Sequence, residues 1–347
     1  MKNIIKSLGA FGALALISVI PQKADACSRV LYKGDDGLYV VARCLDWKTP
    51  IPTNLYVYPR GMQKQSSDQQ NAINWTSKYG AVYAVSYDGG ITEGMNEKGL
   101  VVNGLFNKGT VYNGKEPKPY QMSLAVFDAW ILDQCETVEE VKALLHSVPF
   151  DIQGATFDGG TVSALHWGVT DATGASIIFE FDHGKINIYD MGDYLAMTND
   201  PDWPQMTAIM DYWNNVGGKN MLPGTVRSAD RCVRGNYFAH HVQPTADTDL
   251  GVSIARSVLM NCCVPYTYMI DGEPNLSSTQ WRSYSDLRDR RYYWDVVTNP
   301  GYYYVDLTQL DLKQGAPVLK LDTTKVMDFV GCVNKKLEKS KPFTPMY

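Results

Sequence analysis

Cys27 follows directly after Ala24-Asp25-Ala26, and its position carries the clearest chemical information in the chain. A signal peptidase that cuts after Ala26 makes Cys27 the first residue of the mature protein. Cys27 then carries a free α-amino group and a thiol on one Cα. The amine has a pKa of about 7.7–8.0 and can take the thiol proton. One residue then supplies both a nucleophile and its base. The cut therefore decides whether the chain is an enzyme.

The first 26 residues have the pattern of a cleavable export signal. Lys2 and Lys6 precede an apolar run over residues 8–20, and an Ala-x-Ala cleavage pattern follows. The run is shorter than the roughly 20 residues that span a bilayer, so we expect no retained membrane anchor. We expect an exported protein, periplasmic or secreted, in which residues 27–347 form a single domain.

Two alternatives use Cys27 differently. A lipoprotein signal also ends at a cysteine, whose amine is then blocked, but it favours an aliphatic residue three places before the cysteine and a small uncharged one two places before. Here these places hold Ala24 and Asp25, which disfavours a lipidated surface binding protein without excluding it. The other alternative is a disulfide-stabilised secreted domain with no activity.

Composition indicates an ordinary globular protein. Hydrophobic residues make up 45% and charged residues 20%, which is typical of soluble domains. The formal net charge is −5 and there is no basic run, which argues against nucleic acid as a partner. The 22 tyrosines and 8 tryptophans supply large amphipathic surfaces, suited to an apolar pocket or to an oligomer interface.

The other six cysteines favour disulfides in an exported chain, with the pairing left open. They are Cys44, Cys135, Cys232, Cys262, Cys263 and Cys332. Their spacing contains no CxxC and no Cys/His cluster, and the five histidines, including His240-His241, have no metal-ligand spacing. We therefore expect no metal and no organic cofactor.

The order of the expected elements predicts an α+β fold in one domain, because strands and helices come in runs and do not alternate as βαβ units. Strands are expected at 30–32, 38–42, 55–58, 81–85, 164–170, 176–181, 186–189, 194–197, 292–297 and 302–305. Helices are expected over 124–132, 138–145, 228–241 and 250–260. The second helix follows a capping box, Thr137-x-x-Glu140. Cys27 then opens the first strand, which holds it rigidly.

Residues 43–47 lie on the strand that returns toward Cys27 after a turn over residues 33–37. A hairpin of this length brings Arg43 and Asp46 close to Cys27. The carboxylate can orient an α-ammonium group, and the guanidinium can lower the pKa of a thiol. The residues by themselves fit a surface Arg–Asp pair at a strand end equally well.

These segments resemble the choloylglycine hydrolases, the family of bile salt hydrolases and penicillin V acylases. The resemblance rests on Cys27-Ser28-Arg29 with residues 43–47, on Asn-Glu-x-Gly-Leu within residues 94–100, on Thr-Asn-x-Pro at 198–201, on Leu-Pro-Gly through Ser-x-x-Arg at 222–234, and on the Tyr-rich residues 302–304. Each segment alone is unspecific. Their shared order covers nearly the whole mature chain.

The resemblance implies an N-terminal-nucleophile (Ntn) hydrolase fold, in which two antiparallel sheets lie between helical layers (αββα). It makes Cys27 the nucleophile and its amine the general base. Asp46 and Arg43 would position the amine and tune the thiol. Asn199 would donate its side-chain amide to the oxyanion of the tetrahedral intermediate.

Arg231 would brace the site electrostatically, with Arg234, one helical turn away, as the alternative. Without the resemblance these residues have plainer interpretations. Asn199 before Asp200-Pro201 is typical of a turn, and the two arginines fit a solvated helix face.

The chain departs from the family where a backbone N–H should complete the oxyanion hole. Family members carry Asn or Tyr after a Gly-Leu pair, whereas here Gly104-Leu105 is followed by Phe106 and then Asn107. An ungapped alignment selects Phe106, and Asn107 remains the alternative. A backbone donor survives this change, but the side-chain cue that separates bile salt from penicillin substrates is lost.

The resemblance implies hydrolysis of a small-molecule amide by Cys27. The leading expectation is a conjugated bile salt, releasing glycine or taurine, with penicillin V or another N-acyl amide as the alternative. It also implies a homo-oligomer, a tetramer in the family. Many family members begin at Met-Cys and stay in the cytoplasm, so the expected signal fits a periplasmic enzyme of a Gram-negative bacterium.

Overall fold

The computed structural model describes residues 26–154, 156–157, 161–271, 276–326 and 329–347. Except for Ala26, the expected export signal lies outside these residues. None of the described helices is long and apolar enough to cross a bilayer.

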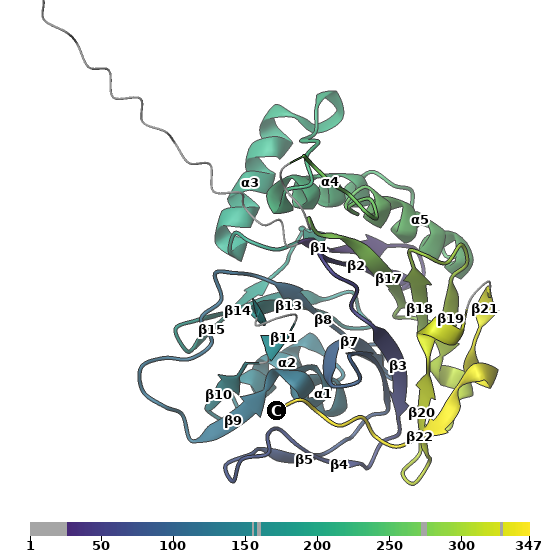
Figure 1. Cartoon of the computed structure of the whole chain (residues 1–347). Coiled ribbons are helices and arrows are strands. Elements are labelled where there is room, and N and C mark those ends of the chain that lie inside the picture. The colour runs from purple at the N-terminus through teal and green to yellow at the C-terminus, as the bar shows by residue number, and fades with distance from the viewer. Residues whose placement is uncertain (1–25, 155, 158–160, 272–275, 327–328) are drawn as a thin grey trace, which may run out of the picture.

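Two large sheets form the centre of the molecule (Figure 1). The strands of the first sheet, in spatial order, are β16 (Ala196–Met197), β1 (Ala26–Lys33), β2 (Tyr39–Trp47), β17 (Ser278–Asp286), β18 (Arg291–Val296), β19 (Tyr303–Asp306) and β21 (Gly331–Cys332). Those of the second sheet are β15 (Lys185–Asp190), β14 (Ser176–Asp182), β13 (Leu165–Thr170), β8 (Val101–Phe106), β7 (Gly90–Asn96), β6 (Ala81–Ser86), β3 (Thr53–Tyr58), β20 (Val318–Leu321) and β22 (Glu338–Ser340).

Short elements connect these strands. The two-stranded pairs are β4 (Gln63–Gln65) with β5 (Asn74–Thr76), β9 (Tyr120–Ser123) with β10 (Phe150–Gln153), and β11 (Thr156–Phe157) with β12 (Thr161–Val162). Four 3₁₀ turns are η1 (Gly218–Asn220), η2 (Leu307–Gln309), η3 (Thr323–Lys325) and η4 (Asn334–Lys336).

Helices cover the outer faces of both sheets. The helices are α1 (Leu124–Gln134), α2 (Val138–Leu145), α3 (Trp203–Val216), α4 (Ser228–His240) and α5 (Thr248–Met260). The first two lie on the second sheet, and α3, α4 and α5 lie on the side of the first sheet (Figure 1). One apolar core fills the space between the sheets and beneath α3–α5, and another lies beneath α1 and α2. These four layers confirm the expected αββα arrangement.

Local sequence signals explain where several helices begin. The Ser123 side chain caps α1 and Asp247 caps α5, each by accepting a hydrogen bond from a first-turn N–H. Thr137 accepts from the N–H of Glu140 at the start of α2, as its capping box predicts. The four expected helices are therefore present within a few residues of their predicted bounds.

The structure also contains elements that the sequence analysis missed, among them β7, β8, β17, α3 and several short strands such as β9, β10, β20 and β22, and the strand expected at 194–197 is limited to Ala196–Met197. The expectation of disulfides is wrong in the part of the chain that the structure describes, where all seven cysteines are free thiols. Cys44, Cys135, Cys232 and Cys262 are buried and act as small apolar side chains in the cores.

The hairpin of β1 and β2 places Cys27 as predicted. Its register pairs Ala26 with Asp46 and Cys27 with Leu45. The turn uses Asp36 and Gly37, whose φ angles of 51° and 73° lie in the left-handed region that asparagine-like residues and glycine tolerate. On its other side β1 pairs with β16, the short strand that leads to Asn199.

Candidate active site

Cys27 lies at the start of β1, with a side chain that is 5% exposed. Its backbone nitrogen donates a hydrogen bond to Oδ1 of Asn199 at 2.7 Å. Because Ala26 precedes it in this chain, this nitrogen is a peptide N–H; in a chain cut after Ala26 the same atom is the α-amine. The contact therefore holds in place the atom that the sequence analysis expects to act as the base.

Asn199 connects Cys27 to the second sheet. Its Oδ1 accepts from the Cys27 nitrogen and from Nη2 of Arg231 at 2.8 Å, while its Nδ2 donates to the carbonyl oxygen of Phe106 at 2.7 Å. These contacts fix which end of the amide points toward Cys27. One N–H of the amide is engaged with Phe106.

Arg231 lies on α4 and its guanidinium is fully buried behind Cys27. Nη1 donates to the carbonyl oxygen of Cys27 at 2.7 Å and to Oγ of Ser28 at 2.6 Å, and Nε donates to the carbonyl oxygen of Val226 at 2.8 Å. With the bond to Asn199, the two terminal guanidinium nitrogens hold the start of β1 and its partner Asn199, while Nε ties the side chain to the loop before α4. The structure thus places Arg231 where a bracing role requires it.

The side chain of Arg234 binds backbone carbonyl groups outside the site. Its guanidinium donates to the carbonyl oxygens of Pro223, Thr225 and Asn261. Of the two candidate arginines, Arg231 is therefore the one whose hydrogen bonds reach Cys27 and Asn199.

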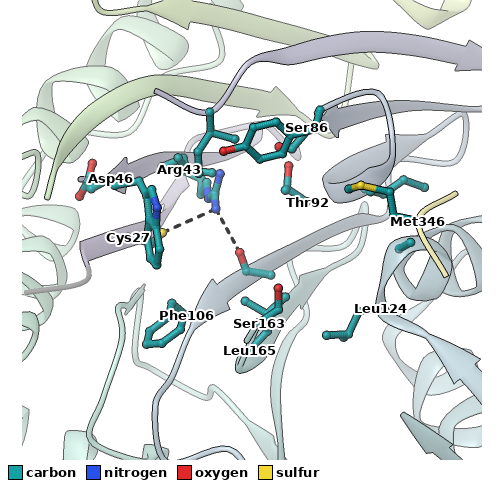
Figure 2. Close-up of a pocket in the computed structure, with 18 residues that line it drawn as sticks. Cys27, Arg43, Asp46, Ser86, Thr92, Phe106, Leu124, Ser163, Leu165 and Met346 are labelled. Atoms are coloured by element: carbon teal, nitrogen blue, oxygen red, sulfur yellow. Dashed lines mark hydrogen bonds between the residues drawn. The ribbon is translucent and has the colours of Figure 1, made fainter. Parts of the chain in front are cut away.

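Arg43 contacts the thiol from the neighbouring strand. Its Nη2 lies 3.7 Å from Sγ of Cys27 and 3.1 Å from the carbonyl oxygen of Gly104 (Figure 2). Its Nη1 lies 3.3 Å from a carboxylate oxygen of Glu93, and its guanidinium carbon lies 4.5 Å from the ring centroid of Trp281. The cation is thus buried between a carboxylate, an aromatic face and the thiol.

Asp46 is fully buried beside the start of β1. Burial raises the pKa of its carboxyl to about 6, although the charge of Arg231 opposes the shift. Oδ2 accepts from the Cys44 thiol at 3.5 Å, whereas Oδ1 has no hydrogen-bond partner among the described residues. A buried acceptor without a donor is costly, and an ammonium group at Cys27 would supply the missing donors.

The surroundings of the Cys27 thiol favour its protonated form over the thiolate. Burial raises the pKa of Cys27 above its ordinary value, and the positive charge of Arg43 is the largest opposing effect. The thiol in this environment therefore needs a base to remove its proton.

The backbone of β8 decides between the two oxyanion candidates. The N–H of Asn107 donates to the carbonyl oxygen of Ala164 at 2.8 Å, so it is engaged. Phe106 pairs with Leu165 in a register that turns the peptide groups of residues 104 and 106 away from β13. The carbonyls of these two residues indeed accept from Arg43 and Asn199. Phe106 is therefore the candidate whose N–H faces the site.

A buried polar network that the sequence analysis missed supports Arg43. Glu93 on β7 accepts from the hydroxyl of Tyr292 at 2.5 Å and from the amide of Asn103 at 3.2 Å. The Oδ1 of Asn103 in turn accepts from Nε of Arg29 at 2.8 Å. These partners come from both sheets. A charged residue in the middle of a buried strand, Glu93, is the signal that could have revealed the network.

A mostly apolar cavity of about 120 Å³ opens beside Cys27. Its walls include Arg43, Asp46 and Phe106, whereas Asn199 and Arg231 are not among its lining residues. The apolar walls are made by Leu45, Trp47, Ile51, Ile91, Phe106, Leu124, Leu165 and Met346, with hydroxyls from Ser86, Thr92 and Ser163. The cavity can bind an apolar group next to the thiol.

Comparisons with known proteins match this geometry. A model of the linear amide C–N hydrolases, choloylglycine hydrolase family, matches residues 27–328. A penicillin V acylase of Pectobacterium atrosepticum is 32% identical over 93% of this chain and 92% of its own. A bile salt hydrolase/transferase of Clostridium perfringens is 30% identical over 82% of this chain and 94% of its own.

Solved structures show the same fold. The structure of a penicillin V acylase from Agrobacterium tumefaciens superposes with a TM-score of 0.83 at 36% identity, over 92% of this chain and 99% of its own. A conjugated bile acid hydrolase from Clostridium perfringens superposes with a TM-score of 0.72 at 21% identity, over 88% and 98%. The family match, the Ntn fold and the buried cysteine agree, and the chain belongs to the choloylglycine hydrolase family of linear amide C–N hydrolases.

Proposed function

We propose that the chain, once cut after Ala26, hydrolyses N-acyl amides with Cys27 as its nucleophile. The observation that carries the proposal is the setting of Cys27: its thiol faces an apolar cavity, and its nitrogen is held by Asn199. The unpaired Oδ1 of Asp46 lies on the residue paired with Ala26, next to the nitrogen that the cut would free. The family match, which begins at Cys27, supports the same boundary.

In the first half of the reaction, the α-amine takes the thiol proton and the sulfur attacks the amide carbonyl carbon. The ammonium group donates to Asn199 and Asp46 while it holds this proton. When the tetrahedral intermediate collapses, the C–N bond breaks and the proton passes to the leaving amine. The acyl group remains on Cys27 as a thioester.

In the second half, water loses a proton to the same amine and attacks the thioester. The sulfur leaves and the carboxylic acid product is released. The N–H of Phe106 and the second amide N–H of Asn199 act as the oxyanion donors in both halves. The carbonyl of Phe106, bonded to Asn199, keeps the two donors on one side of Cys27.

The cavity favours a compact aryl acyl group, such as the phenoxyacetyl group of penicillin V. This cavity, about 120 Å³, is close in size to the dry cavity of about 150 Å³ that holds benzene, so it can take most of one ring while the rest of the acyl group lies toward the thiol or the open end. Trp47 and Phe106 have ring centroids 5.8 Å apart in its wall and offer aromatic faces to such a group. The two penicillin V acylases among the relatives above support this acyl class.

A conjugated bile salt is the second candidate. The cavity wall includes Tyr87 and Met346, which are 39% and 43% exposed, so the cavity is open to solvent at these side chains. An amphipathic sterol could extend past them with its polar face in water. The relative from Clostridium perfringens, named a bile salt hydrolase/transferase, supports this class.

The test is a substrate panel on the mature protein. Penicillin V, glycocholate and taurocholate are incubated with wild type and with Cys27→Ser, and the released amine is measured. We expect penicillin V to be cleaved with the highest kcat/KM and Cys27→Ser to lose all measurable activity. Release of glycine or taurine at a higher kcat/KM selects the bile salt class, and equal activity of Cys27→Ser refutes the mechanism.

We also propose that the cut occurs during export and delivers the enzyme to the periplasm or the exterior of a Gram-negative cell. The Ala24-x-Ala26 pattern after an apolar run supports this location.

A further inference from the structure

We propose that Met346 sets the depth of the acyl pocket and thereby its choice of acyl group. The proposal rests on the proposed function, because it concerns the substrate class of the same site. Met346 belongs to residues 341–347, which we call the strap. The strap follows β22 and runs back across the second sheet to the cavity (Figure 1).

Met346 forms the end of the cavity that lies farthest from the thiol. Figure 2 shows Cys27 and Met346 on opposite sides of the pocket, with Leu124 beside Met346. The backbone N–H of Met346 donates to the carbonyl oxygen of Gly89 at 2.9 Å. A Cβ placed on Gly89 would come within 2.6 Å of Cγ of Met346, so the methionine packs tightly on a residue without a side chain.

Aromatic contacts anchor the rest of the strap. The ring of Phe343 packs edge-on against Tyr56 and Tyr58, with centroid distances of 5.8 and 6.1 Å. The N–H of Phe343 donates to the hydroxyl of Tyr58 at 2.9 Å, and the hydroxyl of Tyr347 donates to the carbonyl oxygen of Gln65 at 3.4 Å. The strap is thus fixed on both sides of Met346, by two tyrosines of the second sheet and by the backbone of β4.

The strap also lines a second cavity. That cavity measures about 410 Å³, and its lining includes Pro342, Phe343, Pro345 and Tyr347. Ile91 lines both cavities, so the two lie next to each other. Met346 lines the first cavity, and its neighbours in the strap line the second. Removing the strap would therefore take wall residues from both cavities.

This arrangement gives Met346 a direct effect on selectivity. The short pocket accepts a single ring, and an acyl group as long as a sterol must either leave it or displace Met346. A methionine is unbranched and flexible, so replacing it changes the room available without disturbing a rigid core. One or a few methylenes of space in such a pocket change relative rates by about 10–200-fold.

The experiment compares Met346→Ala, a chain that ends at Ser340, and wild type. For each, kcat/KM is measured for penicillin V and for glycocholate. In matched Cys27→Ala forms, which cannot turn over, calorimetry gives the Kd values of phenoxyacetate and cholate. We expect the cholyl-to-phenoxyacetyl ratio to rise about tenfold or more in Met346→Ala, and further in the shortened chain, in both measurements.

Met260→Ala is the matched control, because Met260 has a similar exposure of 47% but lies on α5, on the other sheet. Its ratios should equal those of wild type. Ratios within about twofold of wild type in both test variants overturn the proposal, and so does binding of neither acid to any form. If the shortened chain does not fold, Met346→Ala decides alone. If wild type cleaves neither amide but the Kd ratio still shifts, the proposed function fails and the role of Met346 stands.

Discussion

At the scale of single residues, the main chemical requirement of the proposed mechanism is that the buried thiol of Cys27 lose its proton at neutral pH. Burial raises the pKa of Cys27, and the charge of Arg43 compensates only in part. In the proposed mechanism, a base on the same residue removes the proton over the shortest path. Asn199 holds the nitrogen of Cys27 directly, and Arg231 in turn holds Asn199.

The first prediction concerns Asn199. Replacing it with Ala removes one oxyanion donor and the acceptor for the Cys27 nitrogen, so we expect kcat to fall by about 10²–10³-fold. Asn199→Asp keeps the acceptor but loses the donor and adds a negative charge near the oxyanion, so it should be impaired to a similar degree. Steady-state kinetics on penicillin V measure both.

Asn215→Ala serves as the control, because Asn215 lies on α3 and its amide bonds only to the carbonyl of Asp211. Near wild-type activity of Asn199→Asp would show that Asn199 only positions Cys27 and donates nothing to the oxyanion.

The second prediction compares Arg231→Lys with Arg234→Lys, a matched pair one turn apart on α4. A lysine cannot make the four hydrogen bonds of Arg231, and each charged hydrogen bond is worth about 1.5–3 kcal/mol. We expect kcat/KM to fall by about 10–100-fold in Arg231→Lys. Arg234→Lys should lower the melting temperature but keep the activity of the folded protein. The reverse ranking would assign the bracing role to Arg234.

The sequence was sufficient for those site residues that lie close to Cys27 along the chain or within family motifs. The hairpin length alone brings Arg43 and Asp46 to the start of β1. Glu93 and Trp281 could not be found this way, because each reaches Arg43 from a strand far along the chain. Which peptide groups of β8 face the site depends on its pairing with β13, and that register is a tertiary property.

At the scale of elements, the missed strand β17 shows where pattern analysis fails. It lies between β2 and β18 and is buried, yet it reads Ser-Thr-Gln-Trp-Arg-Ser-Tyr-Ser-Asp. Its sequence is mostly polar, and Arg282, for example, is held by Asp295, so the apolar alternation that would predict a strand is absent. The missed helix α3 did carry signals: an N-cap at Asp202, Pro204 in its first turn, and Met206 and Met210 four apart.

The third prediction concerns α1, whose Asp128 is buried under the second sheet. Burial raises the pKa of this carboxyl to about 7, and its Oδ1 accepts from Nε1 of Trp167 at 2.7 Å. The folded protein therefore holds a proton here that the unfolded chain releases near pH 4. Stability from this proton is complete below about pH 4 and is lost as the pH rises through about 7.

Asp128→Asn keeps the acceptor for Trp167 and removes the titration. Relative to wild type, its free energy of unfolding should rise by more than about 1 kcal/mol between about pH 5 and about pH 8, measured by urea titration. A constant difference across this range would mean that the pKa of Asp128 is not raised.

At the scale of the whole molecule, each of the two sheets contributes different residues to the site. The first sheet carries Cys27, Arg43 and Asp46, and the second supplies Phe106 together with cavity walls such as Ile91, Thr92 and Leu165. Asn199 joins the two by bonding to both Cys27 and Phe106. Sequence order predicted the layers, but the part of the cavity wall formed by Met346, 319 positions from Cys27, depends on how the chain packs in three dimensions.

The last prediction follows from the start of the folded chain. While Ala26 is attached, the nitrogen of Cys27 is a peptide N–H, which has no basicity, and Oδ1 of Asp46 has no donor. A precursor in which Ala26→Arg blocks the signal peptidase should therefore fold but show less than about 1% of wild-type activity, because it has a nucleophile without its base. Ala26→Gly, which keeps a small residue at the cut, should be processed and active. For both variants, mass spectrometry shows whether the N-terminus has been cut, and the rate of amide hydrolysis is measured on the same sample. Full activity in the uncut precursor would remove the amine from the mechanism, and a diacylglyceryl group on Cys27 would make the chain a lipoprotein.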